Sequence, residues 1–226
     1  MATQSIEDYI KAIFQLRKGD TSVPTSALAE RLAVRPASVS NMLRRLDDLE
    51  LIRYEPYRGA ILTEAGEKLA RGMIRRHRLI ERFLSEVLDY PWEQVHEEAE
   101  RLEHAVSPRF VEAIDRLLER PLTDPHGAPI PGVDGEMVEE QLPSLSELEP
   151  GEHAVVRRVR DSDPELLKFL RKVGIHPEAR IEILDHGAHD GPIVLRIDGE
   201  SHRMGKKAAD SVYVEQVPNP SHRERE

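Results

Sequence analysis

The segment HEEAERLEH, residues 96–104, is dense in carboxylate and imidazole, the two side-chain types that bind hard and intermediate divalent metal ions. On a helix that turns about 100° per residue, four of these side chains fall within an arc of about 100°. They are His96, Glu100, Glu103 and His104. An apolar stripe from Val95 to Val106 lies beside them, as on a helix packed on one face. The pattern fits either a set of metal ligands or an ordinary solvated polar face. Further candidate ligands elsewhere in the chain are needed to distinguish the two.

The composition limits both the class of protein and the kind of site. Of the 226 residues, 39% are hydrophobic and 33% charged, as in a globular protein of one large or two small domains. The absence of cysteine excludes disulfides, thiolate catalysis and Cys-based zinc sites, so any metal ion must be bound by oxygen and imidazole nitrogen. Because no membrane-length apolar run or signal peptide is visible, we expect a cytoplasmic protein without a membrane partner.

Charge is distributed unevenly along the chain. The net charge is −10, but residues 1–63 contain 9 Lys and Arg against 8 Asp and Glu, a net of +1, which leaves −11 for the remainder. An acidic body with an arginine-bearing head can still present one basic surface to DNA.

Residues 1–63 have the pattern of a winged helix-turn-helix domain. Helical periodicity covers 6–18, 25–33 and 36–51, and Pro36 stands where a first-turn proline belongs. Residues 51–63 form two short extended runs around a Pro-Tyr-Arg-Gly turn, which predicts the hairpin called a wing. A small helical bundle with an incidental hairpin is the alternative.

Residues 64–136 predict a helical domain. We expect helices over 64–89, 92–105 and 109–119, followed by a loop rich in proline and glycine. The first helix carries more apolar surface than one small domain can cover. We therefore expect a second copy of the chain to cover it, so that the protein is a homodimer.

The C-terminal part has a different sequence pattern. Residues 137–150 resemble a linker, and 218–226 a disordered tail. Between them, 151–217 alternate between five short strands and one helix, a pattern that fits a small β-barrel. The expected fold is mainly α with a small β domain.

The layout and motifs together resemble the diphtheria toxin repressor family of metal-dependent transcriptional regulators. Four stretches match the family's N-terminal helix, long dimerisation helix, second metal-bearing helix and linking loop: SIEDYIKAI, RRHRLIERFL, VHEEAERLEHAVS and DPHGAPIPG. The resemblance covers nearly the whole chain and implies that the C-terminal barrel is SH3-like. RYEPYRGAILTEAG together with Asp8 is more similar to the manganese-responsive branch than to the iron-responsive one.

This resemblance implies a primary metal site. Its ligand positions correspond here to Asp8, His77, Glu100, Glu103 and His104. The iron-responsive branch has methionine at the first of these positions and cysteine at the third, so the set in this chain is all carboxylate and imidazole. Such a set suits Mn²⁺, or Fe²⁺, better than it suits thiolate-loving metals. Lys11 stands where some manganese regulators have a glutamate for a second adjacent ion, which argues against a binuclear site.

The resemblance also implies a secondary metal site with ligands from the long helix, the loop and the barrel. The matching positions are Glu81, Asp124, His126 and Asp163, with His96 as an alternate ligand. Asp163 is equally well placed to be the N-cap of the helix that follows it, so both roles stay open.

The expected DNA-binding residues lie at the start of the third helix and on the wing. They are Arg35, Pro36, Ala37, Ser38, Ser40, Asn41, Arg44 and Arg58. First-turn residues of a recognition helix reach base edges, whereas arginines suit phosphates. An ordinary polar helix face is the alternative.

These observations favour a metal-activated repressor that binds a palindromic operator in double-stranded DNA as a homodimer. It is not expected to be an enzyme or to hold an organic cofactor. A metal-dependent hydrolase is the competing hypothesis, although the segment lacks the HExxH spacing and no nucleophile motif stands near it. A winged-helix sensor of an organic ligand is the third.

Overall fold

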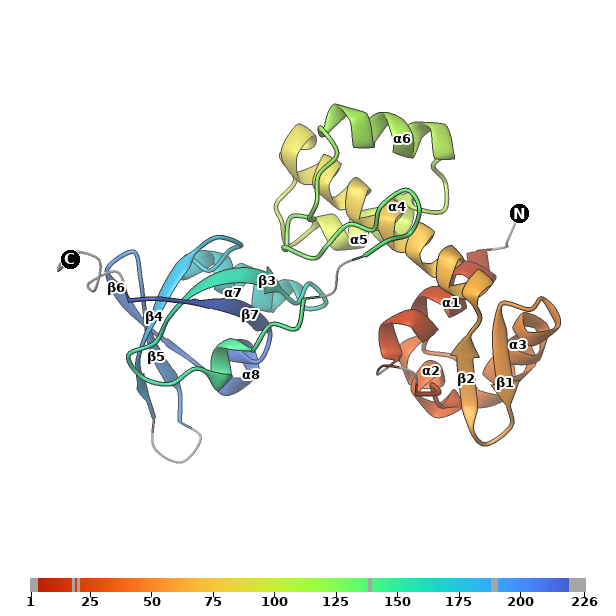
Figure 1. Ribbon diagram of the computed structural model, residues 1–226, viewed down its shortest axis with the longest axis horizontal. Helices are drawn as coiled ribbons and strands as arrows, with labels where there is room; N and C mark the ends of the chain where they lie inside the picture. The colour runs from red at the N-terminus through yellow and green to blue at the C-terminus, as the bar shows by residue number, and fades with distance from the viewer. Residues whose placement is uncertain (1–3, 18, 20, 138–139, 188–190, 220–226) are drawn as a thin grey trace. The chain divides into compact units, whose positions relative to one another are not determined.

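The computed structural model describes residues 4–17, 19, 21–137, 140–187 and 191–219 (Figure 1). The chain divides into two compact units, one formed by residues 1–77 and 131–137 and the other by 78–130 and 138–226. The division falls within the long helix α4, which contributes its first half to one unit and its second half to the other. None of the described helices is both long enough and apolar enough to cross a bilayer.

The first unit contains three helices, a hairpin and the beginning of a fourth helix. These are α1 (Gln4–Leu16), α2 (Thr25–Arg31), α3 (Pro36–Asp48), β1 (Ile52–Glu55), β2 (Gly59–Leu62) and α4 (Glu64–Leu88). The apolar faces of the first three helices meet in one core, where Ile10, Leu28 and Leu43 are fully buried. Proline in the first turn of α3 begins that helix, because its fixed φ suits the helix and its missing N–H leaves no donor without a partner. The predicted winged helix-turn-helix is confirmed.

The hairpin is tied to the segment that precedes α2. Its strands pair antiparallel from Ile52 opposite Leu62 to Glu55 opposite Gly59. Val23 and Ala60 exchange two backbone hydrogen bonds of 2.8 and 3.0 Å. Gly59 has a φ of +106°, and a Cβ there would lie 2.4 Å from the carbonyl oxygen of Val23, so only glycine allows this close approach. The direction of the wing is therefore fixed relative to α2.

The second unit begins with the C-terminal half of α4 and the short helices α5 (Val95–Leu102) and α6 (Pro108–Leu117). Ile80 and Leu84 of α4 pack against α5, and Leu79 packs against α6. Helix α5 is shorter than the expected 92–105. It ends before Glu103, which is its C-cap, and His104 lies in the following turn. The predicted polar face therefore continues beyond the helix.

A row of arginines on α4 holds the loop that follows α6. Each of the four donates to a different backbone carbonyl of that loop. The pairs are Arg71 with Gly135, Arg75 with Pro131, Arg78 with Pro129, and Arg82 with Asp124. Because the arginines recur every three or four residues, they project from one side of the helix and follow the loop along it.

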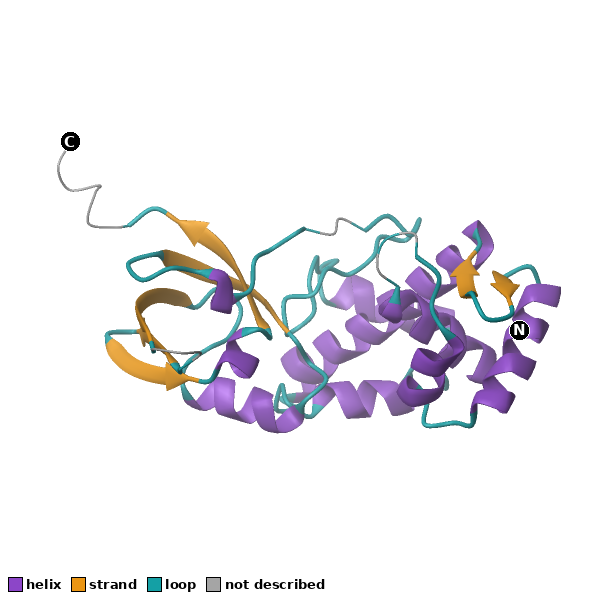
Figure 2. Cartoon of the chain, turned by 90° about the horizontal axis from the view of Figure 1, so that it is seen from below, coloured by secondary structure: helices purple, strands orange, loops and turns teal. Residues whose placement is uncertain are grey.

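The C-terminal part of the second unit is a small antiparallel β-structure (Figure 2). Its strands are β3 (His153–Val159), β4 (Arg180–His186), β5 (Ile193–Ile197), β6 (Glu200–Met204) and β7 (Val212–Val217), in the spatial order β6-β5-β4-β3-β7. Three short helices accompany them: η1 (Leu145–Glu147), α7 (Pro164–Lys172) and α8 (Lys206–Ala209). Inward-facing residues such as Val156, Leu195 and Val214 form a separate core. The predicted fold class is confirmed, whereas η1 and α8 were not foreseen.

Candidate metal centre

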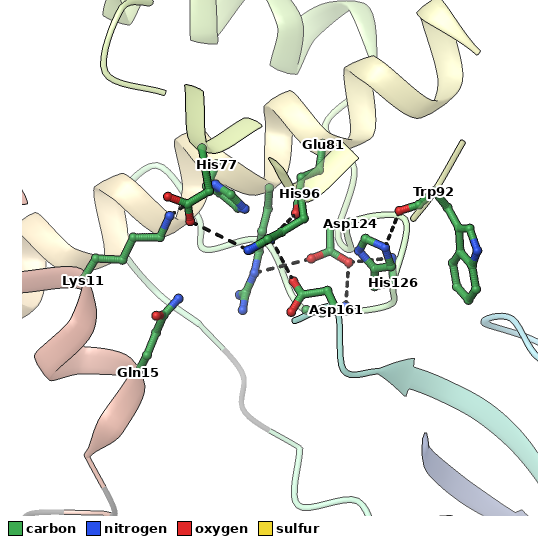
Figure 3. A network of polar contacts seen from close by, with 12 residues as sticks. Lys11, Gln15, His77, Glu81, Trp92, His96, Asp124, His126 and Asp161 are labelled. Carbon is green, nitrogen blue, oxygen red and sulfur yellow. Dashed lines mark hydrogen bonds and ion pairs between the residues drawn. The ribbon is translucent and has the colours of Figure 1, made fainter. Parts of the chain in front are cut away.

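Four acidic or imidazole side chains meet inside the second unit (Figure 3). Glu81 comes from α4, Asp124 and His126 from the loop after α6, and Asp161 from the segment between β3 and α7. One possible ligand atom from each lies within 4.8 Å of those of the others. The first three residues are at most 1% exposed. Three parts of the chain that are distant in sequence thus converge on one buried polar point.

The orientation of His126 is set by its neighbours. Its Nε2 lies 2.8 Å from the carbonyl oxygen of Trp92, which can only accept, so Nε2 carries the hydrogen. A ring that donates from Nε2 can carry its lone pair on Nδ1, and such a nitrogen is the atom type that binds metal ions. Nδ1 is buried and has no hydrogen-bond partner among the described residues. A buried acceptor of this kind is costly unless a ligand satisfies it.

The loop itself positions Asp124. Oδ1 accepts from the backbone N–H groups of His126 and Ala128 at 2.8 and 2.9 Å, which closes a tight turn around the carboxylate. Oδ2 lies 3.6 Å from Nε of Arg78. Because one oxygen is used to form the turn, the other is directed to the remaining members of the group.

The electrostatics of the group favour a bound cation. Burial is the main cause that raises the pKa of Asp124 from 3.8 to about 6; Glu81 and Asp161 raise it too, while His126 and Arg78 oppose them. Three carboxyl groups thus share a small volume near one arginine. A divalent cation would offset this repulsion, and oxygen with imidazole nitrogen is a donor set for Mn²⁺ or Fe²⁺. The residues present therefore fit such an ion.

The structure differs from the sequence-based expectation at one member of this group. Asp161, not Asp163, lies beside Glu81, Asp124 and His126. The Oδ1 atom of Asp163 instead accepts from the backbone N–H groups of Glu165 and Leu166, at 3.0 and 3.2 Å, as the N-cap of α7. This carboxylate is therefore engaged in capping the helix, the second of the two roles considered for it.

His96 lies at the edge of the buried group. Its Nδ1 is 3.0 Å from Oε1 of Glu81 and 3.5 Å from Oδ2 of Asp161, and its Nε2 is 3.8 Å from Oε1 of Glu100. One imidazole thus contacts residues assigned to both predicted sites.

The five residues predicted for the primary site are divided between the two units. In the first unit, Asp8 is half-buried on α1, and His77 is buried on α4 with its Nδ1 3.3 Å from Nζ of Lys11. In the second unit, Glu100 lies on α5, and the buried Glu103 has its Oε1 3.5 Å from Nε2 of His104. Each unit thus contributes both carboxylate and imidazole groups. A single site formed by all five residues remains a prediction.

The residues predicted to contact DNA lie on the surface of the first unit. Arg35 is the N-cap of α3, and Ser40 is half-buried, whereas the remaining helix residues of the set are exposed: Pro36, Ala37, Ser38, Asn41 and Arg44. Arg44 donates to Oδ1 of Asn41 at 3.1 Å, and Arg58 to Oε2 of Glu55 at 3.0 Å. Both guanidinium groups are thereby held at the surface by acceptors three residues away.

Three family profiles match successive parts of the chain. The family profile described as "Iron dependent repressor, N-terminal DNA binding domain" matches residues 1–60. The profile described as "Iron dependent repressor, metal binding and dimerisation domain" matches residues 63–132, and that of the FeoA domain matches 144–216. These matches follow the order of the winged helix, the helical part and the small β-structure.

Two relatives illustrate the similarity in sequence. The iron-dependent repressor IdeR of Mycobacterium leprae is 32% identical over 224 residues, which covers 93% of this chain and 96% of the relative. The HTH-type transcriptional regulator MntR of Bacillus pumilus is 38% identical over 119 residues, covering 53% of this chain and 82% of the relative.

Solved structures show the same similarity in three dimensions. One is described as a manganese-dependent transcriptional repressor in complex with manganese. It has a TM-score of 0.87 and 36% identity, and the match covers 94% of this chain and all of that chain. ScaR with bound Cd²⁺ has a TM-score of 0.79 and 34% identity, and the match covers 94% of this chain and 99% of that one.

Proposed function

Because this chain belongs to the family of iron- and manganese-dependent repressors, we propose that it represses transcription by binding double-stranded DNA when Mn²⁺, or Fe²⁺, is bound. The observation that carries the metal dependence is the buried group around His126, whose Nδ1 is a buried acceptor directed among acidic side chains. Action on chromosomal DNA places the protein in the cytoplasm. The hydrolase alternative has no support, since the relatives are transcriptional repressors or regulators.

We assign the secondary metal site to Glu81, Asp124, His126 and Asp161. A bound divalent cation would offset the repulsion among the three carboxylates, two of which are buried. Since Asp161 precedes α7 and Glu81 lies on α4, the ion would fasten the β-structure to the helical part of the same unit. His96, which already contacts Glu81 and Asp161, would support these ligands from the outside.

The primary site is proposed to use the five residues identified from the family resemblance, Asp8, His77, Glu100, Glu103 and His104. Asp8 comes from the helix that packs on the DNA-reading helices, whereas the last three come from α5 and its C-terminal turn. A cation held by both groups would restrict how the DNA-reading head moves relative to the helical domain. The buried ammonium of Lys11 beside His77 supports a single ion here, because it already places a positive charge next to a ligand.

The protein is proposed to act as a homodimer. Several apolar side chains of α4 and α6 are exposed in the single chain: Val87, Leu88, Phe110 and Leu117. Phe110 packs edge-on against Phe83, which continues the apolar surface back to α4. Two copies joined here would present two recognition helices to a palindromic operator, with half-sites about one DNA turn apart.

Metal ions activate DNA binding, on this proposal, by population shift. The ion binds more tightly to the arrangement that fits DNA, so the ion and DNA must strengthen each other's binding to the same extent. Within the DNA interface, the exposed first turns of α3 would read base edges, and Arg35, Arg44 and Arg58 would contact phosphates.

A DNA-binding titration tests the proposal directly. Duplexes selected by the protein from a random pool are titrated anaerobically with Mn²⁺, Fe²⁺, Zn²⁺ or chelator. We expect Mn²⁺ to raise the affinity at least about tenfold, which corresponds to about 1.4 kcal/mol of coupling. Equal affinity in excess chelator would contradict metal activation.

A further inference from the structure

A hollow of about 370 Å³ opens between α2, α3 and the hairpin of the first unit. Six of its lining residues carry hydrogen-bond donors: Thr25, Ser26, Ser40, Arg44, Tyr54 and Tyr57. The other lining residues are two prolines and a glycine. The chain has 42 acidic residues and a net charge of −10, yet none of the described residues that line this hollow is acidic. Arg44 gives the hollow its one positive charge among these lining residues, and the hydroxyl groups can donate, so the hollow suits an anion that accepts hydrogen bonds.

Tyr57, which lines the hollow, adopts a backbone conformation that is unfavourable for a bulky residue. Its φ is +68°, in the left-handed region that a bulky non-glycine residue rarely adopts. The residue has a relative exposure of 106%, the highest among the large apolar residues described. Backbone strain at a fully exposed residue points to a role outside the chain.

The walls of the hollow are fixed before any ligand arrives. The two backbone hydrogen bonds between Val23 and Ala60 join the hairpin to the start of α2. The Ser22 hydroxyl donates to the carbonyl oxygen of Arg58 at 2.6 Å, next to Tyr57, and the Arg58 N–H closes the turn onto Glu55 at 3.1 Å. A ligand would thus meet a preformed site and would not have to order the wing.

We propose that this hollow seats one backbone phosphate of bound DNA, between the wing and the recognition helix. Arg44 supplies the positive charge, and the hydroxyl groups of Tyr57 and Ser26 donate to the phosphate oxygens. A phosphodiester fits because it carries one negative charge and offers acceptors only, whereas a base edge presents donors as well. This assignment rests on the proposed function and adds a phosphate seat, together with Tyr57, Thr25 and Ser26, to the expected DNA-binding residues.

The test combines protein variants with a scan of the DNA backbone. In a duplex selected by the protein, each phosphate in turn is replaced by an uncharged methylphosphonate, and binding is measured with saturating Mn²⁺. We expect Tyr57→Phe to weaken binding to the unmodified duplex about tenfold, the usual effect of losing a hydrogen bond to a charged group. We expect Ser26→Asp to weaken it more, because it brings a negative charge into the hollow. Ser201→Asp, on exposed β6, is the matched control for net charge and should have no effect.

The decisive result is non-additivity at one phosphate. If the hollow seats a phosphate, one methylphosphonate position will weaken wild-type binding and will no longer respond to Tyr57→Phe. Unchanged thermal unfolding of the variant, expected because Tyr57 is fully exposed, will exclude misfolding. Full additivity at every position, or wild-type affinity in Tyr57→Phe, would overturn the phosphate seat. Metal-dependent binding by the wild type would then still stand, whereas failure of the proposed function would appear as no such binding at all.

Discussion

His126 donates the hydrogen on Nε2 to the carbonyl oxygen of Trp92 across 2.8 Å, and the centroids of the two rings lie 5.4 Å apart. Trp92 is the only tryptophan of the chain. An ion that binds to the opposite nitrogen of His126 would change the charge on this ring. The fluorescence of a single residue therefore reports directly on the proposed secondary site.

The first prediction uses this reporter. Adding Mn²⁺ to the metal-free protein should change the tryptophan emission excited at about 295 nm in a saturable manner, and Glu81→Gln should abolish the change at the concentrations that saturate the wild type. Glu200→Gln, an exposed glutamate on β6, is the matched control and should respond like the wild type. A full response in Glu81→Gln would show that the signal does not come from this site.

The second prediction separates two aspartates that are two residues apart. Asp161→Ala should lower the number of tightly bound Mn²⁺ ions per chain from two to one, because it removes a member of the buried group. Asp163→Ala should keep both ions but lose about 1 kcal/mol of stability, because it removes the N-cap of α7. Metal analysis after gel filtration and denaturant unfolding measure the two effects. Loss of an ion in Asp163→Ala alone would reverse the assignment.

Much of this architecture follows from local patterns in the sequence. The helical spacing of Ile10, Leu43 and similar residues predicts the helices, and turn residues predict the wing, because both signals act over a few residues. Boundaries were less well predicted. Helix α5 ends at Leu102, so Glu103 and His104 lie beyond the helix on which their spacing was calculated.

The candidate site depends on contacts that no local pattern contains. Asp161 and Asp163 are the same residue type and lie two positions apart. Which of them joins the buried group depends on which carboxylate caps α7. The two aspartates bracket Ser162 in the sequence Asp-Ser-Asp, where a proline follows the second, and the capping rule favours the residue next to that proline. This signal was available. The carbonyl of Trp92 orients His126. This role could not be inferred from the sequence, because every residue has a backbone carbonyl.

The third prediction concerns the metal-free protein. Burial raises the pKa of Asp124 to about 6 from 3.8, so the folded state binds this proton more tightly than the unfolded state. The resulting stabilisation is fully present below about pH 4 and is lost as the pH rises through about 6. Asp124→Asn removes the buried charge and should raise the melting temperature in chelator by a few degrees at pH 7.5 but not at pH 4. An equal gain at both pH values would mean that the effect is not electrostatic.

The same variant should behave in the opposite way when metal is present. An amide binds a divalent cation less well than a carboxylate does, so Mn²⁺ should raise the melting temperature of Asp124→Asn less than that of the wild type. Melting curves at several Mn²⁺ concentrations measure this difference. If both proteins gain the same stability, Asp124 does not hold an ion.

The last prediction tests Asp8 as a ligand of the primary site. Asp8→Met replaces an anionic oxygen by a thioether, which prefers softer ions. The order in which Mn²⁺, Fe²⁺, Co²⁺ and Cd²⁺ activate DNA binding should therefore shift towards Cd²⁺, with Mn²⁺ losing at least about tenfold in effective concentration. Asp134→Met, at an exposed loop position in the same unit, controls for the loss of one charge and should leave the order unchanged. An unaltered order in Asp8→Met would remove Asp8 from the ligand set and, with it, the proposed link between metal binding and the DNA-reading helices.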